Sequence, residues 1–150
     1  IVAGVILLLG LIDSLDGIVA VLTNRVSKWG SFLDTMVDRV IDIAIGVLLI
    51  QAGAPALVMS IAVMFTLLHE YMRARAIGLG ITEVAVITVA EKPTRVAIGV
   101  MFFGALGVID SFNVDLIAPS MIVTIAAWTW LVMSVVGCGQ LYRAYRALLV

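Results

Sequence analysis

Long apolar segments separated by short polar breaks dominate this sequence. A helix that crosses a bilayer needs about 20 mainly apolar residues. Segments of roughly that length or longer occupy residues 1–22, 30–51, 55–76, 92–110 and 118–147. The breaks contain residues that favour turns, such as Gly53 and Pro55 or Gly78 and Gly80. We therefore predict an all-α, polytopic bundle of five transmembrane helices that forms a single membrane domain over residues 1–150.

The composition supports this prediction. Hydrophobic residues make up 63% and charged residues 13% of the chain, whereas soluble domains average about 45–50% and about 25%. The mean hydropathy is +1.23. A formal net charge of −1 identifies no partner by itself, and we expect contact with membrane lipids but not with nucleic acid. The single cysteine, Cys138, excludes an intramolecular disulfide.

The charged residues are distributed unevenly over the two predicted sides of the membrane. If the helices alternate in direction, all nine basic residues reach one side: Arg25, Lys28, Arg39, Arg73, Arg75, Lys92, Arg95, Arg143 and Arg146. The loop between the last two helices carries Asp110 and Asp115 on the other side. Cytoplasmic loops of membrane proteins are enriched in Lys and Arg. The basic side is therefore predicted to face the cytoplasm.

Four aspartates in the first two predicted helices are candidate metal ligands. Asp13 and Asp16 share one helix face, and Asp34 and Asp38 follow Gly30 as a second ladder. An ionised Asp at the centre of a membrane costs roughly 2.5–3.5 kcal/mol. Divalent cations bind carboxylate oxygens and compensate such charges. We therefore predict a metal site just below the cytoplasmic surface, open to a soluble reactant and to a lipid.

These positions resemble the signature of the CDP-alcohol phosphatidyltransferase family. That signature reads D-x-x-D-G-x-x-A-R, then eight residues, then G-x-x-x-D-x-x-x-D. The matching residues are Asp13, Asp16, Gly17, Ala20, Gly30, Asp34 and Asp38, with the eight-residue gap intact. One position departs, because Val21 stands where the family has Arg, and Arg25 follows about one turn later. The resemblance extends from near residue 5 to the last helix.

The resemblance implies a fold and a reaction. Members of the family have six transmembrane helices preceded by an interfacial helix, so this chain would lack that helix and the first span. They transfer a phosphatidyl-type group from a CDP-linked lipid donor to an alcohol, release CMP in phospholipid biosynthesis, and commonly form homodimers. They require Mg²⁺ or Mn²⁺, and we expect two ions.

The resemblance also assigns roles to the signature residues. The expected metal ligands are Asp13, Asp16, Asp34 and Asp38. Asp38 is in addition the candidate general base for the acceptor hydroxyl. The expected nucleotide-binding residues are Asp13, Asp16, Gly17, Ala20, Gly30 and Asp34. Glycine lets a ligand approach the helix backbone closely.

A second group of residues indicates the acceptor. The segments HEYMRARAIGLG (69–80) and AEKPTR (90–95) resemble the branch that makes phosphatidylinositol phosphate or its archaeal ether-lipid counterpart. Converging Lys and Arg side chains suit a phosphorylated polyol such as inositol phosphate. The candidates on this rim are Arg73, Arg75, Lys92, Arg95 and Arg143. Ordinary loop charge is the alternative for each one.

Several alternatives remain open from sequence alone. Glycerol phosphate, as in phosphatidylglycerophosphate-type synthases, or serine are competing acceptors, and a soluble CDP-inositol is a competing donor. A cation channel or transporter, or an inactive scaffold, would also carry intramembrane acids. Asp42 continues the Asp34–Asp38 ladder, either as a functional group or as a buried partner of Arg39 or a neighbouring helix. His69 is interpreted mainly as a polar interfacial residue.

Overall fold

The structure is a computed structural model that describes residues 2–8, 10, 27–81, 86–112 and 118–149. A short helical stretch at 2–8 precedes four long helices, which are α2 (Lys28–Gln51), α3 (Ala56–Gly78), α4 (Lys92–Phe112) and α5 (Pro119–Leu149). The described residues contain no β-strand. The predicted all-α class is therefore confirmed, and the bounds of the long helices agree with the sequence to within two residues.

Some predictions lie outside the described residues. They concern the first half of the family signature, namely Asp13, Asp16, Gly17, Ala20, Val21 and Arg25. Most of the first expected span, and the loop that carries Asp115, lie outside as well.

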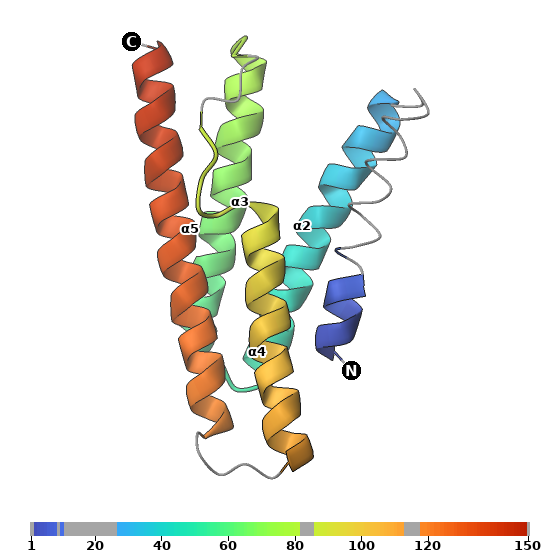
Figure 1. The fold of residues 1–150 in the computed structure, drawn as a ribbon. Coiled ribbons are helices and arrows are strands. Elements are labelled where there is room, and N and C mark those ends of the chain that lie inside the picture. Colours follow the sequence, from blue (N-terminus) through green and yellow to red (C-terminus); the bar gives the residue numbers. More distant parts are fainter. Residues whose placement is uncertain (1, 9, 11–26, 82–85, 113–117, 150) are drawn as a thin grey trace.

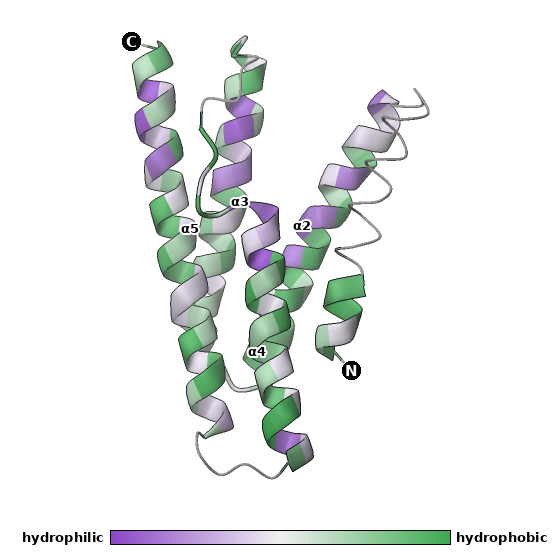
Figure 2. Ribbon diagram, in the orientation of Figure 1, coloured by the Kyte–Doolittle hydropathy of each residue, from purple (hydrophilic) through white to green (hydrophobic). Residues whose placement is uncertain are grey.

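Three described helices, α3, α4 and α5, are long and apolar enough to cross a membrane. α2 does not belong to this set, and it carries Asp34, Asp38, Arg39 and Asp42 along its length. Charged side chains are costly in a bilayer unless they are paired, so the environment of these four residues decides how α2 is accommodated. Figure 2 shows that hydrophilic residues gather on the upper halves of α2, α3 and α5 and at the start of α4, above a mainly hydrophobic lower bundle.

The helices alternate in direction along the chain, so that α3 and α5 run parallel to each other, and the bundle opens toward one end (Figure 1). α3 and α5 run side by side, α4 lies against α5, and the second half of α2 packs on α3 (Figure 1). The first half of α2 leans away from α3. We call the end of the bundle where α2 begins and where α3 and α5 finish the open end. Every basic residue that the structure describes lies in the half of its helix nearest that end.

The core explains why α2 is held only through its second half. The buried hydrophobic residues of α2, Ile45 and Leu49, pack with Met59 and Ala62 of α3 and with residues of α4 and α5. Gly46 permits a close helix crossing, because a Cβ there would lie 2.7 Å from Val63 Cγ2. Small residues at such crossings are typical of membrane helices.

The turns between the helices follow local chemistry. Ser27 caps α2 by accepting a hydrogen bond from Gly30 N at 2.9 Å. α3 ends before Gly80, whose φ of +92° is a left-handed conformation that glycine adopts without strain. Ile81 N then donates to Ala76 O at 3.1 Å.

After α3 the chain returns into the bundle before α4 begins. We call residues 86–91 the inner loop; within it Thr88 and Ala90 are buried. Val89 N donates to Gln140 Oε1 at 3.0 Å, and Ala90 O accepts from Arg95 Nη1. Irregular backbone at membrane depth needs partners of this kind, because lipid offers none. α4 consequently starts deep in the molecule, and Lys92 is its first residue (Figure 1).

Candidate functional site

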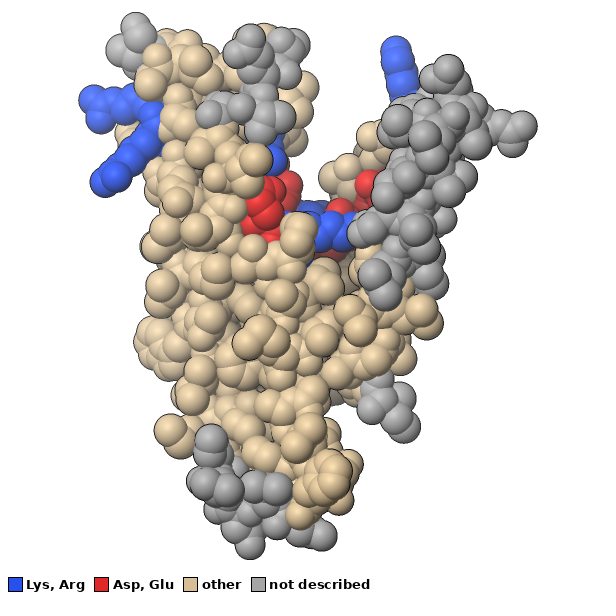
Figure 3. All heavy atoms as spheres, viewed as in Figure 1, with Lys and Arg blue, Asp and Glu red and all other residues tan. Residues whose placement is uncertain are grey.

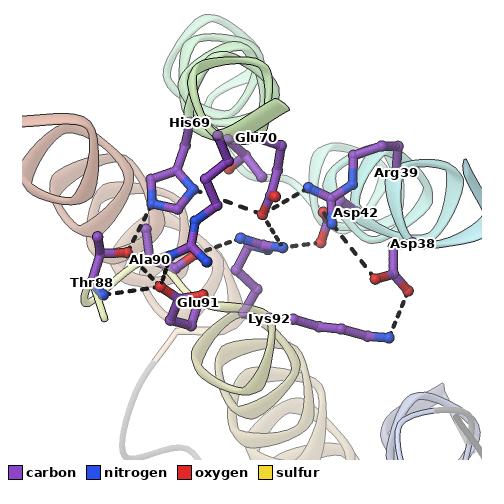
Figure 4. Close-up of polar contacts among 12 residues, drawn as sticks. Asp38, Arg39, Asp42, His69, Glu70, Thr88, Ala90, Glu91 and Lys92 are labelled. Carbon is purple, nitrogen blue, oxygen red and sulfur yellow. Dashed lines mark hydrogen bonds and ion pairs between the residues drawn. The ribbon is translucent and has the colours of Figure 1, made fainter. Parts of the chain in front are cut away.

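Charged side chains gather where α2 separates from the rest of the bundle. Figure 3 shows the molecule hollowed at its open end, with acidic and basic side chains at the bottom of the hollow. α2, α3 and α4 all contribute to this cluster (Figure 4). The hollow is the place where soluble and lipid-borne reactants could meet the same polar groups, so we consider it the candidate functional site.

Asp38 and Lys92 form a direct ion pair between α2 and the start of α4 (Figure 4). Lys92 Nζ lies 2.6 Å from Asp38 Oδ1, and the other carboxylate oxygen, Oδ2, is 3.8 Å from Arg39 Nη2. The side chain of Asp38 is 13% exposed and that of Lys92 is 29% exposed. A signature carboxylate on α2 is thus paired with the first residue of α4. The two residues are 54 positions apart in the chain, so only the fold brings them into contact.

Below this pair, two arginines and two carboxylates form a closed ring. Arg39 Nη1 lies 2.9 Å from Glu70 Oε1, and Arg39 Nη2 lies 3.4 Å from Asp42 Oδ2. Arg95 completes it with Nε at 3.0 Å from Asp42 Oδ1 and Nη2 at 3.3 Å from Glu70 Oε1. We call these four residues, Arg39, Asp42, Glu70 and Arg95, the charge ring. It links α2, α3 and α4 with no net charge (Figure 4).

The charge ring explains how α2 accommodates two of its charged residues. Asp42 is 4% exposed and Arg95 is 2% exposed, so neither is solvated by bulk water. Buried charges persist in proteins when they are paired and hydrogen-bonded. Of the two interpretations of Asp42, the structure therefore supports the buried partner of Arg39 and of a neighbouring helix.

A second cluster fastens the inner loop to α3. Glu91 Oε1 accepts from Thr88 N at 2.9 Å, from Thr88 Oγ1 at 3.0 Å and from Arg73 Nη2. His69 Nε2 is 2.8 Å from Thr88 Oγ1, and His69 is fully buried. The interfacial position expected for His69 is therefore wrong, because the inner loop covers its ring.

The structure brings together some of the predicted acceptor residues. Arg73 pairs with Glu91 in the second cluster, Lys92 pairs with Asp38, and Arg95 belongs to the charge ring. The rim position expected for Arg95 is wrong, because its guanidinium is buried and binds Asp42, Glu70 and Ala90 O. Its contact with an acceptor phosphate stays a prediction, which this geometry does not favour.

The other two predicted acceptor residues lie elsewhere or are not joined to the cluster. Arg143 lines a shallow surface depression with Gly139, Tyr142, Arg146 and Ala147, and none of the cluster residues contributes to it. Arg75 is exposed on α3. It is two positions from Arg73, a spacing that places side chains on different faces of a helix.

The described residues fit part of the predicted metal site. Asp34 and Asp38 lie one turn apart on α2, Asp34 exposed and Asp38 largely buried. Their carboxylates are the hard oxygen donors that Mg²⁺ and Mn²⁺ prefer. Among the described residues no group of three His, Cys, Asp or Glu side chains is placed to hold a metal. The other two predicted ligands, Asp13 and Asp16, lie outside those residues.

Sequence reasoning missed two members of the charge ring. Sequence reasoning assigns no role to Glu70, and it treats Arg39 only as a residue of the basic side and as one possible partner of Asp42. A signal was available, because both lie well inside predicted spans, where an ionisable residue indicates a partner on a neighbouring helix. The ion pairs join residues 39, 42, 70 and 95. These residues lie on three different helices, so spacing within one helix cannot predict the whole ring.

Comparisons with known proteins place these residues in context. The sequence matches the CDP-alcohol phosphatidyltransferase family over residues 1–136. It is 36% identical over 105 residues to the archaetidylinositol phosphate synthase of Pyrococcus horikoshii, which covers 65% of this chain and 53% of that protein. It is 40% identical over 88 residues to the phosphatidylinositol phosphate synthase of Cutibacterium acnes, with 53% of this chain and 42% of that protein covered.

A third relative is similar over a shorter stretch. The archaetidylinositol phosphate synthase of Aeropyrum pernix is 39% identical over 71 residues, which is 47% of this chain and 37% of that protein. The chain thus spans about half or less of the length of these curated relatives. No solved structure matches the chain significantly.

Proposed function

Since the chain belongs to the CDP-alcohol phosphatidyltransferase family, we propose that it is the membrane-embedded core of a transferase in phospholipid biosynthesis. The reaction moves a substituted phosphoryl group from a CDP-linked lipid to a polyol phosphate and releases CMP. The observation that carries this proposal is the Asp38–Lys92 pair. It sets a signature carboxylate beside a cation of the acceptor segment (Figure 4).

Asp38 is the proposed general base. The acceptor hydroxyl oxygen attacks the lipid-linked phosphorus, the bond from that phosphorus to the CMP oxygen breaks, and the hydroxyl proton passes to the Asp38 carboxylate. Phosphoryl transfer depends mainly on positioning and on neutralising charge on the phosphate oxygens. The largely buried Asp38 side chain is held on a helix, which limits the directions its carboxylate can take.

The proposed metal and nucleotide sites combine described and undescribed residues. Asp34 and Asp38, with Asp13 and Asp16, would hold two Mg²⁺ or Mn²⁺ ions, which supply charge neutralisation for the pyrophosphate. Gly30, which follows Ser27 in the first turn of α2, would let the nucleotide approach that helix. Gly17 and Ala20 would serve the same purpose on the preceding segment.

The proposed acceptor is inositol phosphate, in keeping with what the relatives are named for. Arg73 and Lys92, at 26% and 29%, have more exposed side chains than Arg39 and Arg95, at 13% and 2%, so they are the proposed contacts for the acceptor phosphate. Arg75 and Arg143 are kept from the set predicted from sequence, whose fifth member, Arg95, is buried. The basic open end of the bundle is proposed to face the cytoplasm, and a homodimer is the proposed assembly.

The test is CMP release by the purified protein in lipid nanodiscs. CDP-linked ether and ester lipids are each paired with inositol phosphate, glycerol phosphate, serine or no acceptor, and CDP-inositol is included as a soluble donor. We expect release that requires Mg²⁺ or Mn²⁺, stops with EDTA and is fastest with inositol phosphate. Absence of CMP release from every pair by folded protein would refute the proposal. Faster turnover of glycerol phosphate would replace the acceptor only.

A further inference from the structure

We propose that the charge ring is a positioning device: Arg39, Asp42, Glu70 and Arg95 hold Asp38 and Lys92 opposite each other, and none of the four binds the acceptor phosphate. The inference rests on the proposed function for its kinetic consequences. Its structural part, the placement of α2 against α3 and α4, stands on the geometry alone (Figure 4).

The first argument is where the packing of α2 stops. The buried residues of this helix are Asp42, Ile45, Gly46 and Leu49, all in its second half. Residues 28–37 are exposed, and this half leans away from α3 (Figure 1). Asp38 lies at the boundary, one turn before Asp42. Among the described residues the hydrophobic packing of α2 does not extend to Asp38, so the ion pairs of Arg39 and Asp42 are the described contacts that hold this part of the helix toward α3 and α4.

The second argument is how α4 begins. Lys92 is the first residue of α4, and Arg95 lies one turn later. Each guanidinium nitrogen of Arg95 has its own partner: Nε binds Asp42, Nη2 binds Glu70, and Nη1 binds Ala90 O in the inner loop. One side chain thus ties the start of α4 to α2, to α3 and to the loop that leads into it. Because Lys92 is attached to this fixed turn, its reach toward Asp38 is set by the same contacts.

The third argument excludes a direct role in binding phosphate. The ring carries two positive and two negative charges, and each arginine contacts both carboxylates. The Arg95 guanidinium is buried, so a phosphate that bound it would have to displace Asp42 or Glu70, and that carboxylate would lose one of its two arginine partners in the ring. Arg73 and Lys92 are paired with Glu91 and Asp38, but their side chains are 26% and 29% exposed, so a phosphate can approach them from solvent.

The kinetic test uses Arg95→Lys, Asp42→Asn and Glu70→Gln in the nanodisc assay. Lysine keeps the charge of Arg95 but cannot contact three partners in the directions of a guanidinium. A displacement of about 1 Å in an active site can cost roughly 100-fold in rate. We expect kcat to fall by at least tenfold in each variant, the KM for inositol phosphate to stay within threefold, and the inhibition constant of inorganic phosphate to stay within threefold. The matched controls, Arg146→Lys and Asp110→Asn, are exposed positions outside the site and should match the unaltered protein.

The opposite kinetic pattern would overturn the inference. If Arg95 were a phosphate ligand, Arg95→Lys would raise KM and the phosphate inhibition constant tenfold or more with kcat unchanged. Glu70→Gln would then tighten phosphate binding, because it releases a guanidinium. Unchanged kcat in all three variants would equally refute a positioning role.

A structural readout separates this inference from the proposed function. Spin labels at Phe32→Cys on α2 and Ile77→Cys on α3, both exposed positions, report how far the two helices stand apart, in a Cys138→Ser background. We expect Glu70→Gln and Asp42→Asn to broaden and lengthen the distance distribution, and Asp110→Asn to leave it unchanged. A narrow, unaltered distribution in both ring variants would refute the inference, even if the protein released no CMP. If Arg95→Lys failed to fold, the two carboxylate variants would still decide.

Discussion

Asp38 on α2 and Lys92 at the start of α4 form an ion pair, with Lys92 Nζ 2.6 Å from Asp38 Oδ1. This contact joins the proposed nucleotide and metal site to the proposed acceptor site. The carboxylate belongs to the motif expected to handle the nucleotide and metal, and the ammonium belongs to the segment expected to bind the acceptor. Each residue has a distinct consequence when it is altered.

Replacing Asp38 with Asn should remove the proposed base without changing the size of the side chain. General bases typically contribute 10²–10⁴-fold, so we expect kcat for CMP release to fall at least 100-fold. Asp110→Asn, an exposed Asp at the other end of α4, serves as the control. Size-exclusion profiles should be unaltered in both variants. Activity within threefold of the unaltered protein would remove Asp38 from the base role.

Removing divalent ions should abolish turnover and leave the helices intact. The described candidate ligands, Asp34 and Asp38, are not part of the hydrophobic core, so we expect the helices to fold without a bound ion. We expect EDTA to stop CMP release and excess Mg²⁺ or Mn²⁺ to restore it, with circular dichroism unchanged throughout. Continued release in EDTA would contradict a metal-dependent mechanism.

Replacing Arg73 with Gln should weaken binding of the acceptor phosphate. A hydrogen bond to a charged group contributes about 1.5–3 kcal/mol, so we expect the KM for inositol phosphate to rise at least tenfold. The KM for the CDP-linked donor should change less than threefold. Arg143→Gln is the informative companion, because Arg143 lines a different surface and should alter the acceptor KM less than Arg73→Gln does. The reverse order would return Arg143 to the acceptor site and remove Arg73 from it.

Adding a methyl group at Gly137 should destabilise the protein. A Cβ there would overlap Ala90 Cβ and lie 3.4 Å from Ala90 N and from His69 Cδ2, so the inner loop must shift. Overpacking of this kind costs about 1–3 kcal/mol. We expect Gly137→Ala to lower the melting temperature in detergent. Gly139→Ala, where nothing lies within 4 Å of the added Cβ, should not lower it. Equal melting temperatures for the two variants would show that the loop yields freely.

Replacing Trp130 with Phe should remove one hydrogen bond between α3 and α5. Trp130 Nε1 donates to Thr66 Oγ1 at 3.0 Å, and both residues are buried. Hydrogen bonds between membrane helices contribute about 0.6 kcal/mol on average. Phenylalanine also leaves part of the space of the fully buried indole empty, so we expect a loss of stability on chemical unfolding that exceeds this amount. Trp128→Phe, at a half-exposed position of the same helix, should cause less. A larger effect at Trp128 would contradict this account.

The sequence predicted more of the fold than of the site. Helix bounds depend on local features, which are the length of each apolar segment and residues such as Ser27 or Gly80 that favour helix ends. Signature spacing likewise placed Asp34 and Asp38 on one helix, as they are on α2, and their role as metal ligands stays a prediction. The rim position predicted for Arg95 is wrong. The place of a residue in the sequence does not show how deep in the molecule the inner loop sets the start of α4.

By itself, the sequence determined the all-α class, the four long helices, the concentration of basic residues toward one end and the family signature. Those properties follow from hydrophobic length and from side-chain spacing within single helices. Only the tertiary structure decided that Lys92 meets Asp38 and that Arg39, Asp42, Glu70 and Arg95 close into a ring. The reason is physical: a buried charge needs an opposite charge within a few ångströms, and which partner it finds depends on how helices far apart in the chain are packed.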